Sequence, residues 1–193
     1  KMGYALAVMA RRRGAAVTLI SGPSELPAPR GVNFIPVQTA LEMRDSVLDH
    51  LKEATVVIKA AAVADYRPTV CQKTKIKKTA GKMTVRLERN PDIIAAIGEK
   101  KGSRIVVGFA MESDHVLENA KAKLIRKRMD FIVANDLTMP GAGFRTDTNI
   151  IRILDGKGGD ETFPLMDKLD AAGAILDRVR KVRNDKRTRD ERC

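Results

Sequence analysis

The sequence predicts an α/β fold with a largely parallel sheet and helices on both of its faces. Short apolar runs rich in β-branched residues alternate along the chain with longer stretches that repeat apolar residues at helical spacing. This alternation is typical of parallel strands that are joined by helices. The 193 residues contain no linker long enough to divide them, and a chain of this length can bury a core of its own.

The predicted strands are short apolar runs bounded by glycine, proline or charged residues. Residues 55–61 form a continuous and mostly apolar run, as expected of a strand that is covered on both faces. Two runs on either side of the glycine-rich residues 156–159 predict a closing C-terminal hairpin. In order, the predicted strands are residues 16–20, 32–37, 55–61, 83–87, 104–110, 130–134, 148–154 and 161–165.

The predicted helices begin at recognisable caps. Thr39 followed by Glu42 three residues later forms a capping box, because each side chain can satisfy a free backbone N–H of the first turn. Asn90 followed by Pro91 predicts another start, with asparagine as the cap and proline in the first turn. The predicted helices cover residues 4–13, 39–51, 90–97, 114–128 and 167–183.

The chain is basic, with a net charge of +12, which favours an anionic partner. Eight of the basic residues lie within residues 178–192, so we expect a domain over residues 1–180 and a basic, disordered tail over residues 181–193. Aromatic residues make up 4% of the chain, which leaves few stacking platforms for single-stranded nucleic acid. A nucleic-acid partner is therefore disfavoured.

Cysteine content and hydropathy indicate the compartment. Cys71 and Cys193 cannot form a disulfide framework, and no apolar stretch is long enough to span a membrane. A reduced, cytoplasmic protein with no membrane partner is expected. The first residues, KMGYALAVMARRRG, resemble the interior of a domain, so we expect that residues upstream are missing.

Ligands of parallel sheets bind at the carboxyl ends of the strands, which draws attention to the stretch AAAVADYRPTVCQKTKIKK at residues 60–78. Asp65 follows a predicted strand and either caps a turn or contacts a ligand. The lysines that follow, Lys73, Lys75, Lys77 and Lys78, form either a solvated loop or a flap that closes over a polyphosphate.

Two further motifs follow strands. Residues 90–93 open a helix whose free N–H groups could face an anion, and Phe109 ends a strand ahead of Lys123 and Lys127, which share one helix face. Capping and a solvated helix face explain these motifs equally well. There is no GxxxxGK[ST] or GxGxxG motif, which argues against a P-loop enzyme and a nicotinamide-dependent oxidoreductase. His50 and His115 lie on predicted helices and are surface residues rather than parts of a catalytic triad.

Together these motifs resemble the phosphopantothenate–cysteine ligase family of coenzyme A biosynthesis in its bacterial, CTP-using form. The motifs AAAVADYRP, KIKK, NPDI and VGFA, the KLIRK helix of Lys123 and Lys127, and AND followed by D-x-N occur in the family's order over residues 1 to about 180. The resemblance implies a Rossmann-like fold, a homodimer, CTP as co-substrate and Mg²⁺ or Mn²⁺. It further implies that 4′-phosphopantothenate and L-cysteine are joined through an acyl-cytidylate. A flavin-dependent decarboxylase is often fused to such domains, and no flavin is expected in this chain.

The resemblance also implies site residues. Lys75 is the implied catalytic residue, as the flap lysine that stabilises charge on the phosphates. Asn135 and Asp136 lie in a family motif without an assigned role. The implied nucleotide-binding residues are Lys59, Ala60, Ala61, Asp65, Lys75, Asn90, Pro91, Asp92, Ile93, Phe109, Lys123 and Lys127, and the metal ligands are unknown.

The chain departs from the family at its front. The family begins with a strand and a glycine-containing loop whose asparagine is expected to bind the acyl-cytidylate, whereas this sequence starts at the K-M-G that ends the loop. The alternative function, from a different class, is a non-catalytic α/β domain that binds nucleotides or nucleic acid through its basic residues.

Overall fold

The structure is a computed structural model that describes residues 1–72, 74–77, 81–112, 116–136 and 146–190. Several residues considered above lie outside these ranges. They are Lys73, Lys78, His115 and Cys193.

A five-stranded sheet forms the centre of the molecule, in the order β10-β9-β7-β6-β3. Three strands run parallel: β3 (Val56–Lys59), β6 (Ile105–Glu112) and β7 (Phe131–Asp136). β9 (Ile151–Asp155) pairs antiparallel with β7, and β10 (Asp160–Thr162) folds back on β9. The predicted parallel sheet and its closing C-terminal hairpin are confirmed.

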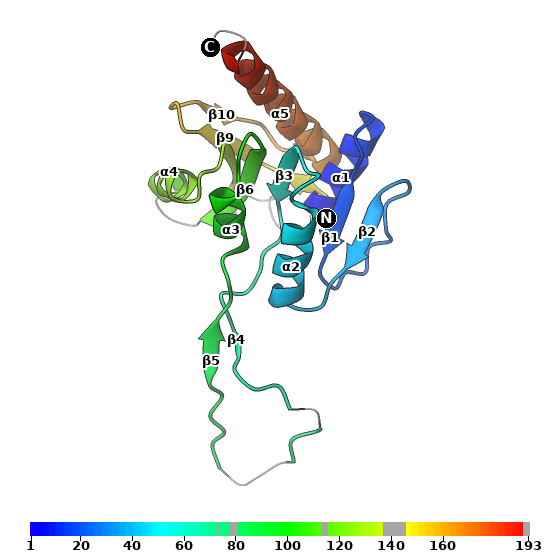
Figure 1. The fold of residues 1–193 in the computed structure, drawn as a ribbon, viewed down its shortest axis with the longest axis vertical. Coiled ribbons are helices and arrows are strands. Elements are labelled where there is room, and N and C mark those ends of the chain that lie inside the picture. Colours follow the sequence, from blue (N-terminus) through cyan, green and yellow to red (C-terminus); the bar gives the residue numbers. More distant parts are fainter. Residues whose placement is uncertain (73, 78–80, 113–115, 137–145, 191–193) are drawn as a thin grey trace.

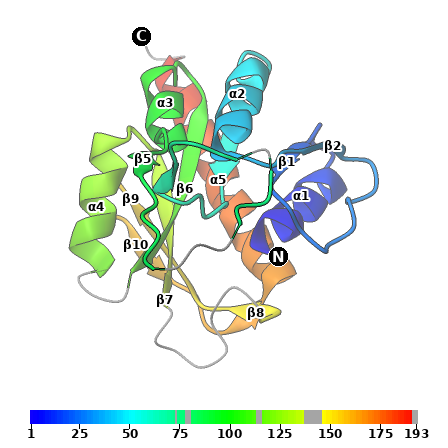
Figure 2. The same ribbon diagram turned by 90° about the horizontal axis from the view of Figure 1, so that it is seen from below.

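Helices cover both faces of this sheet, as the sequence predicts (Figure 2). α1 (Met2–Arg12) and α5 (Lys168–Asp190) pack against each other on one face. α2 (Ala40–His50), α3 (Ile93–Glu99) and α4 (Val116–Arg126) contribute to the core on the other face. The sheet therefore separates two hydrophobic cores.

The strands alternate between these two cores because successive side chains of a strand point to opposite faces. In β6, Ile105 and Val107 join the core under α1 and α5, while Val106 joins the core under α3 and α4. All three side chains are buried. This burial on both faces explains why the strand reads as a continuous apolar run.

A second, two-stranded parallel sheet lies beside the first. It consists of β1 (Thr18–Ser21) and β2 (Asn33–Pro36). Among the described residues β1 pairs only with β2, and β3 pairs only with β6. The free edges of β1 and β3 both line a cavity of about 1400 Å³, which α1 also borders.

The helix starts agree with the sequence in one case and differ in another. The Glu42 N–H donates to Thr39 Oγ1 over 3.1 Å, so the predicted cap of α2 is confirmed. The predicted cap of α3 at Asn90 is wrong, because α3 begins at Ile93 with Asp92 as its N-cap. The Asn90 side-chain oxygen, which a cap would use, instead accepts from Arg67 Nη1 over 3.0 Å, and Nδ2 donates to the Ala64 carbonyl over 2.8 Å.

A long arm projects away from the body between β3 and α3 (Figure 1). Its base is an antiparallel pair, β4 (Tyr66–Pro68) and β5 (Leu87–Arg89). The strand predicted at residues 83–87 is wrong for residues 83–86, which lie outside any strand. The apolar pattern there lacks a core to pack against, because Met83, Val85 and Leu87 are all exposed.

The C-terminal part of the chain is more regular than predicted. β8 (Thr148–Asn149) pairs with β11 (Met166–Asp167), and α5 then continues without interruption to Asp190. Residues 181–190 are therefore helical, where the sequence was interpreted as a disordered tail. They contain no glycine or proline, and Lys186 anchors them to Asp130 with an Nζ–Oδ1 distance of 3.0 Å.

Candidate functional site

The carboxyl end of β3 places Lys59 on the wall of the cavity. Lys59 is the last residue of the strand, and Ala60 and Ala61 follow it along the cavity wall. Lys59 Nζ donates to the Ala61 carbonyl over 2.9 Å, so the ammonium group lies against the backbone of the residues that follow the strand. The sequence placed these three residues together, and the structure places all three on the cavity.

Asp92 and Lys127 form an ion pair on the side of the same site. Lys127 Nζ lies 2.9 Å from Asp92 Oδ2. The other carboxylate oxygen, Oδ1, accepts the Ala95 N–H over 3.1 Å as the N-cap of α3. Asp92 therefore joins the start of α3 to the residue that follows α4, two motifs that lie far apart in the sequence.

The pKa shifts indicate that these charges act on one another. Burial lowers the pKa of Lys59 from its ordinary value, and the positive charge of Lys127 lowers it further, while Asp92 and Asp65 oppose this. Burial works to raise the pKa of Asp92, but hydrogen bonds from Lys127 and from the Ala95 N–H and the charges of Lys127 and Lys59 together hold it below its ordinary value. Lys59, Asp92 and Lys127 thus form one electrostatic unit, which we call the charge cluster.

Phe109 and Ile93 line the same cavity. Phe109 lies in the second half of β6 and is partly buried, so its ring offers an apolar surface to the cavity. Ile93, at the start of α3, is 2% exposed and also belongs to the core behind the site. Both residues were predicted to bind the nucleotide, and that role stays a prediction.

The cavity is also lined by Asn135 and Lys168. Both side chains are buried, and the Asn149 amide donates to Asn135 Oδ1 over 3.1 Å. The AND motif drew attention to Asn135 but gave it no role, and Lys168 carried no signal in the sequence. The side chain of Asp136 lies outside the described part of the structure.

Asp65, Asn90 and Pro91 lie at the base of the arm rather than on the cavity wall. The Asn90 N–H donates to the Asp65 carbonyl over 2.8 Å, and Arg67 Nη1 donates to Asn90 Oδ1 over 3.0 Å. Arg67 Nη2 also pairs with Glu88 at 2.9 Å. The sequence did not single out Arg67 as a site residue, yet this side chain connects both strands of the arm to Asn90.

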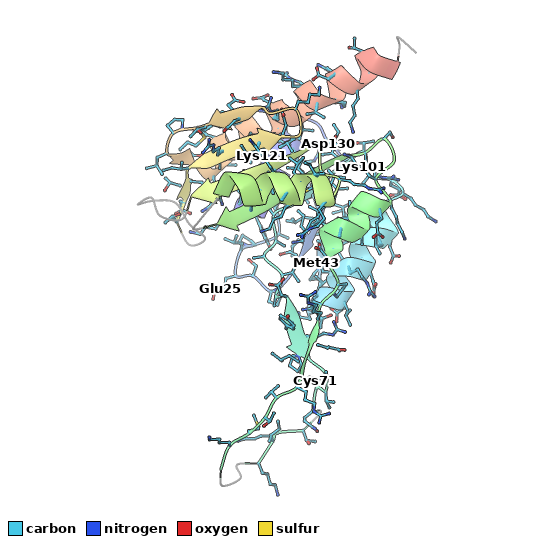
Figure 3. The ribbon with its side chains drawn as sticks, turned by 90° about the vertical axis from the view of Figure 1, so that its left-hand side faces the viewer. Glu25, Met43, Cys71, Lys101, Lys121 and Asp130 are labelled. Carbon is cyan, nitrogen blue, oxygen red and sulfur yellow. The ribbon has the colours of Figure 1, made fainter. Side chains whose placement is uncertain are left out.

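Lys75 is not brought to the charge cluster. It lies on the exposed outer part of the arm, which Figure 1 shows extending away from the sheet. Cys71, labelled in Figure 3, marks how far this segment stands from the body. Lys123 lies on α4, whereas Lys127 lies just beyond its last residue, Arg126, so the two do not share one helix face as predicted. The structure thus brings one part of the predicted site together and leaves Lys75, the lysine predicted to be catalytic, apart from it.

Two further properties of the described residues bear on function. They contain no group of three or more histidine, cysteine, aspartate or glutamate side chains that could hold a metal ion. No helix among them has the length and hydropathy that crossing a membrane requires.

The charge cluster suits a polyanion. Two ammonium groups and one carboxylate give the cluster a net positive charge, its member Lys59 lines the cavity, and ammonium groups bind phosphate oxygens. The apolar wall supplied by Phe109 and Ile93 fits a planar base or another apolar group.

Comparisons with known proteins identify related chains. Residues 1–182 match the family described as the DNA/pantothenate metabolism flavoprotein C-terminal domain. Over 180 residues the chain is 47% identical to the coenzyme A biosynthesis bifunctional protein CoaBC of Bacillus subtilis (strain 168). This alignment covers 93% of this chain and 44% of that protein. The protein of the same name from Escherichia coli (strain K12) is 43% identical over 183 residues, covering 93% of this chain and 45% of that protein.

A solved structure has the same architecture. The crystal structure of the C-terminal domain of coenzyme A biosynthesis bifunctional protein CoaBC superposes with a TM-score of 0.81 at 39% identity, covering 95% of this chain and 84% of that chain. The chain spans less than half the length of the two curated relatives named above.

Proposed function

The chain belongs to the DNA/pantothenate metabolism flavoprotein C-terminal domain family, and from this premise we propose that it is a CTP-dependent phosphopantothenate–cysteine ligase. Its relatives are named as coenzyme A biosynthesis bifunctional proteins, and the solved C-terminal domain of such a protein has the same fold. The observation that carries the proposal is the charge cluster of Lys59, Asp92 and Lys127, of which Lys59 lines the cavity.

The proposed reaction has two steps. The carboxylate of 4′-phosphopantothenate attacks the α-phosphorus of CTP, a C–O–P bond forms, and pyrophosphate leaves with the electrons of the broken P–O bond. The amine of L-cysteine then attacks the activated carbonyl carbon, CMP leaves, and the amine gives up a proton. Activation is required because an unactivated carboxylate would have to expel oxide.

In this proposal the described residues act mainly by binding and by stabilising charge. Lys127 and Lys59 neutralise phosphate oxygens, and Asp92 keeps the two ammonium groups oriented before the nucleotide arrives. Phe109 packs against the base. Ala60 and Ala61 bring the backbone close to the ligand because their side chains are small.

Lys75 enters this proposal through the arm. Its exposed position fits a flap that closes over the triphosphate after binding, or that reaches the site of a second copy of the chain. We propose a homodimer, because the exposed large apolar side chains of the arm need a partner surface. These side chains are Tyr66, Val70, Ile76, Met83, Val85 and Leu87.

The divalent cation is proposed as part of the nucleotide. The described residues offer no cluster of acidic side chains to hold it, and the charge cluster has only one carboxylate, which Lys127 already pairs. Mg²⁺ ordinarily binds oxygen atoms of substrate phosphates and water. When bound, it would neutralise phosphate charge, and no step is assigned to protein ligands for it.

Two partners lie outside this chain. We propose that a preceding segment supplies a strand between β1 and β3, where both free edges line the cavity. Such a strand, followed by α1 and then by β1, gives the usual right-handed crossover between parallel neighbours. A fused decarboxylase with its flavin is proposed from the bifunctional name of the relatives.

The test is pyrophosphate release from CTP, measured on the chain extended by its natural upstream residues. Release should require phosphopantothenate, CMP should appear only when L-cysteine is added, and ATP should be a poorer substrate than CTP. An extended chain that binds CTP but releases no pyrophosphate with phosphopantothenate present would argue for the non-catalytic alternative.

A further inference from the structure

Helix α3 approaches the turn after α4 unusually closely at Gly98. A Cβ added to Gly98 would lie 2.2 Å from the Lys127 carbonyl oxygen and 3.0 Å from its carbonyl carbon. Side-chain carbon atoms do not approach backbone atoms this closely, so any other residue at position 98 would push the turn away. The obstacle is backbone and cannot rotate aside.

Backbone conformation does not explain this glycine. Gly98 lies inside α3, and it is absent from the described glycines with positive φ. Within a helix, alanine is intrinsically more favourable than glycine. A glycine is therefore needed at position 98 because it permits the close contact with the backbone of Lys127.

The turn on the other side of the contact is held in one conformation. The Met129 N–H donates to the Leu124 carbonyl and the Arg128 N–H donates to the Ile125 carbonyl, which is the hydrogen-bond pattern of a Schellman cap. Arg128 adopts φ 52° there, a left-handed conformation in which glycine is the usual residue. Lys101, just beyond α3, donates to the Arg128 carbonyl over 2.9 Å and so fastens the turn to α3.

The contact determines where the Lys127 ammonium lies. The Lys127 carbonyl touches the C-terminal end of α3 at Gly98, whereas its Nζ reaches Asp92 at the N-terminus of the same helix. The side chain therefore runs along α3, and it is only 17% exposed. A shift of the turn would move the Lys127 backbone relative to Asp92, so the ion pair would have to lengthen or the lysine stem would have to leave its present path along α3.

We propose that Gly98 is a positioning residue that sets the geometry of the charge cluster by allowing α3 to touch the backbone of Lys127. The effect on nucleotide binding rests on the function proposed above, whereas the effect on the ion pair does not. The alternative is that Gly98 serves packing alone, in which case a substitution changes stability without changing the ion pair.

The test is Gly98→Ala in the 193-residue chain, with the titration of the Asp92 carboxyl carbon followed by NMR. We expect the Asp92 pKa to rise toward its ordinary value, because the Lys127 ammonium that lowers it moves away. Gly173→Ala is the matched control: it is also a helical glycine, but its added Cβ would lie 3.5 Å from the Arg13 Nη2 and meets no backbone. An Asp92 pKa that does not move in a folded Gly98→Ala variant overturns the proposal.

A second variant keeps the test decisive if Gly98→Ala does not fold. In Gly98→Ala/Arg128→Gly the turn gains freedom to move aside, because glycine tolerates the left-handed conformation and its neighbours. This double variant should fold and show the raised Asp92 pKa. Arg128→Gly alone should fold and leave the Asp92 pKa unchanged. A double variant with an unchanged Asp92 pKa also overturns the proposal.

Nucleotide binding separates this inference from the proposed function. Calorimetry with Mg²⁺ and CTP should show at least about a tenfold loss of affinity in Gly98→Ala, the size expected for a displaced charge-assisted contact, and no loss in Gly173→Ala. A raised Asp92 pKa with unchanged CTP affinity would uphold the positioning role and count against the nucleotide site itself.

Discussion

Asp130 receives two lysines from opposite directions, with Lys101 Nζ 2.8 Å from Oδ2 and Lys186 Nζ 3.0 Å from Oδ1. Figure 3 shows Asp130 and Lys101 side by side at the edge of the body. The Val106 N–H also donates to Oδ2 over 2.8 Å, and the carboxylate is only 10% exposed. This single side chain joins β6, β7, the loop after α3 and the last helix.

Asp130→Ala should destabilise the fold strongly. It leaves a buried N–H without an acceptor and two lysines without a counter-charge, which together cost about 3 kcal/mol in the free energy of unfolding. Urea denaturation measures this loss. Asp45→Ala is the control, since Asp45 pairs with Arg44 at a surface where the carboxylate is 58% exposed and the expected cost is below about 1 kcal/mol. Equal losses for the two variants would contradict the assignment.

Lys127→Met should weaken CTP binding by about 10- to 100-fold, because a charge-assisted contact to phosphate is lost while the apolar stem along α3 is kept. Lys121→Met is the matched control on α4, as Lys121 is exposed and lies outside the charge cluster (Figure 3). Calorimetric titration with Mg²⁺ and CTP compares them. If both variants bind CTP like the parent, the charge cluster is not the nucleotide site.

Asp92 should make stability depend on pH in the acid range. Its folded-state pKa lies below the ordinary 3.8, so its contribution is fully present above that value and is lost as the pH falls through the lower, folded-state pKa. Asn also caps helices well, so Asp92→Asn removes the charge and keeps the cap. The difference in Tm between the two chains should be present at about pH 7 and should shrink as the pH falls below the ordinary pKa and through the folded-state pKa of Asp92. A difference that persists unchanged at acid pH would show that the charge is not its source.

Lys75→Gln should reduce turnover of the extended chain by about 10²–10³, the size of a lost contact to developing charge. Lys77→Gln, two residues along the same exposed segment, should have a much smaller effect. Initial rates of pyrophosphate release provide the comparison. Equal reductions would indicate that the arm contributes general positive charge and that Lys75 has no individual role.

The arm should govern association. Val85→Asp and Leu87→Asp place charges on two exposed apolar positions of the arm and should weaken a dimer that buries them. Ile125→Asp is the control, because Ile125 is 73% exposed on α4 in the body of the molecule. Sedimentation equilibrium measures the monomer–dimer constant. A constant that changes only with Ile125→Asp would place the interface elsewhere.

Much of the fold could be predicted from local patterns. The apolar runs of β3, β6 and β7 and the Thr39–Glu42 cap carry strong local signals, and each corresponds to an observed element. The cap predicted at Asn90 is wrong because the Asn90 side chain makes tertiary contacts instead, with Oδ1 accepting from Arg67 and Nδ2 donating to Ala64. The disordered tail predicted for residues 181–190 is wrong because their charge suggested a solvated segment. The Lys186–Asp130 ion pair that holds them against the body cannot be predicted from the sequence.

The candidate site divides in the same way. Lys59, Asp92 and Lys127 were predicted as separate motifs, and their grouping required the sheet to bring β3, α3 and α4 together. The position of Lys75 was not predictable, because the projection of the arm depends on Arg67 contacts at its base. Gly98 carried no signal, since an ordinary helical glycine looks the same whether or not a carbonyl lies against it.

The free edges of β1 and β3 have a consequence for handling the chain. An apolar strand with one unpaired row of backbone groups is a template on which another chain can add a strand. Two such edges face the same cavity, so an extended segment from a neighbouring molecule could pair with both at once. Protein concentration, as much as temperature, should therefore decide whether refolding of these residues ends in single molecules or in aggregates.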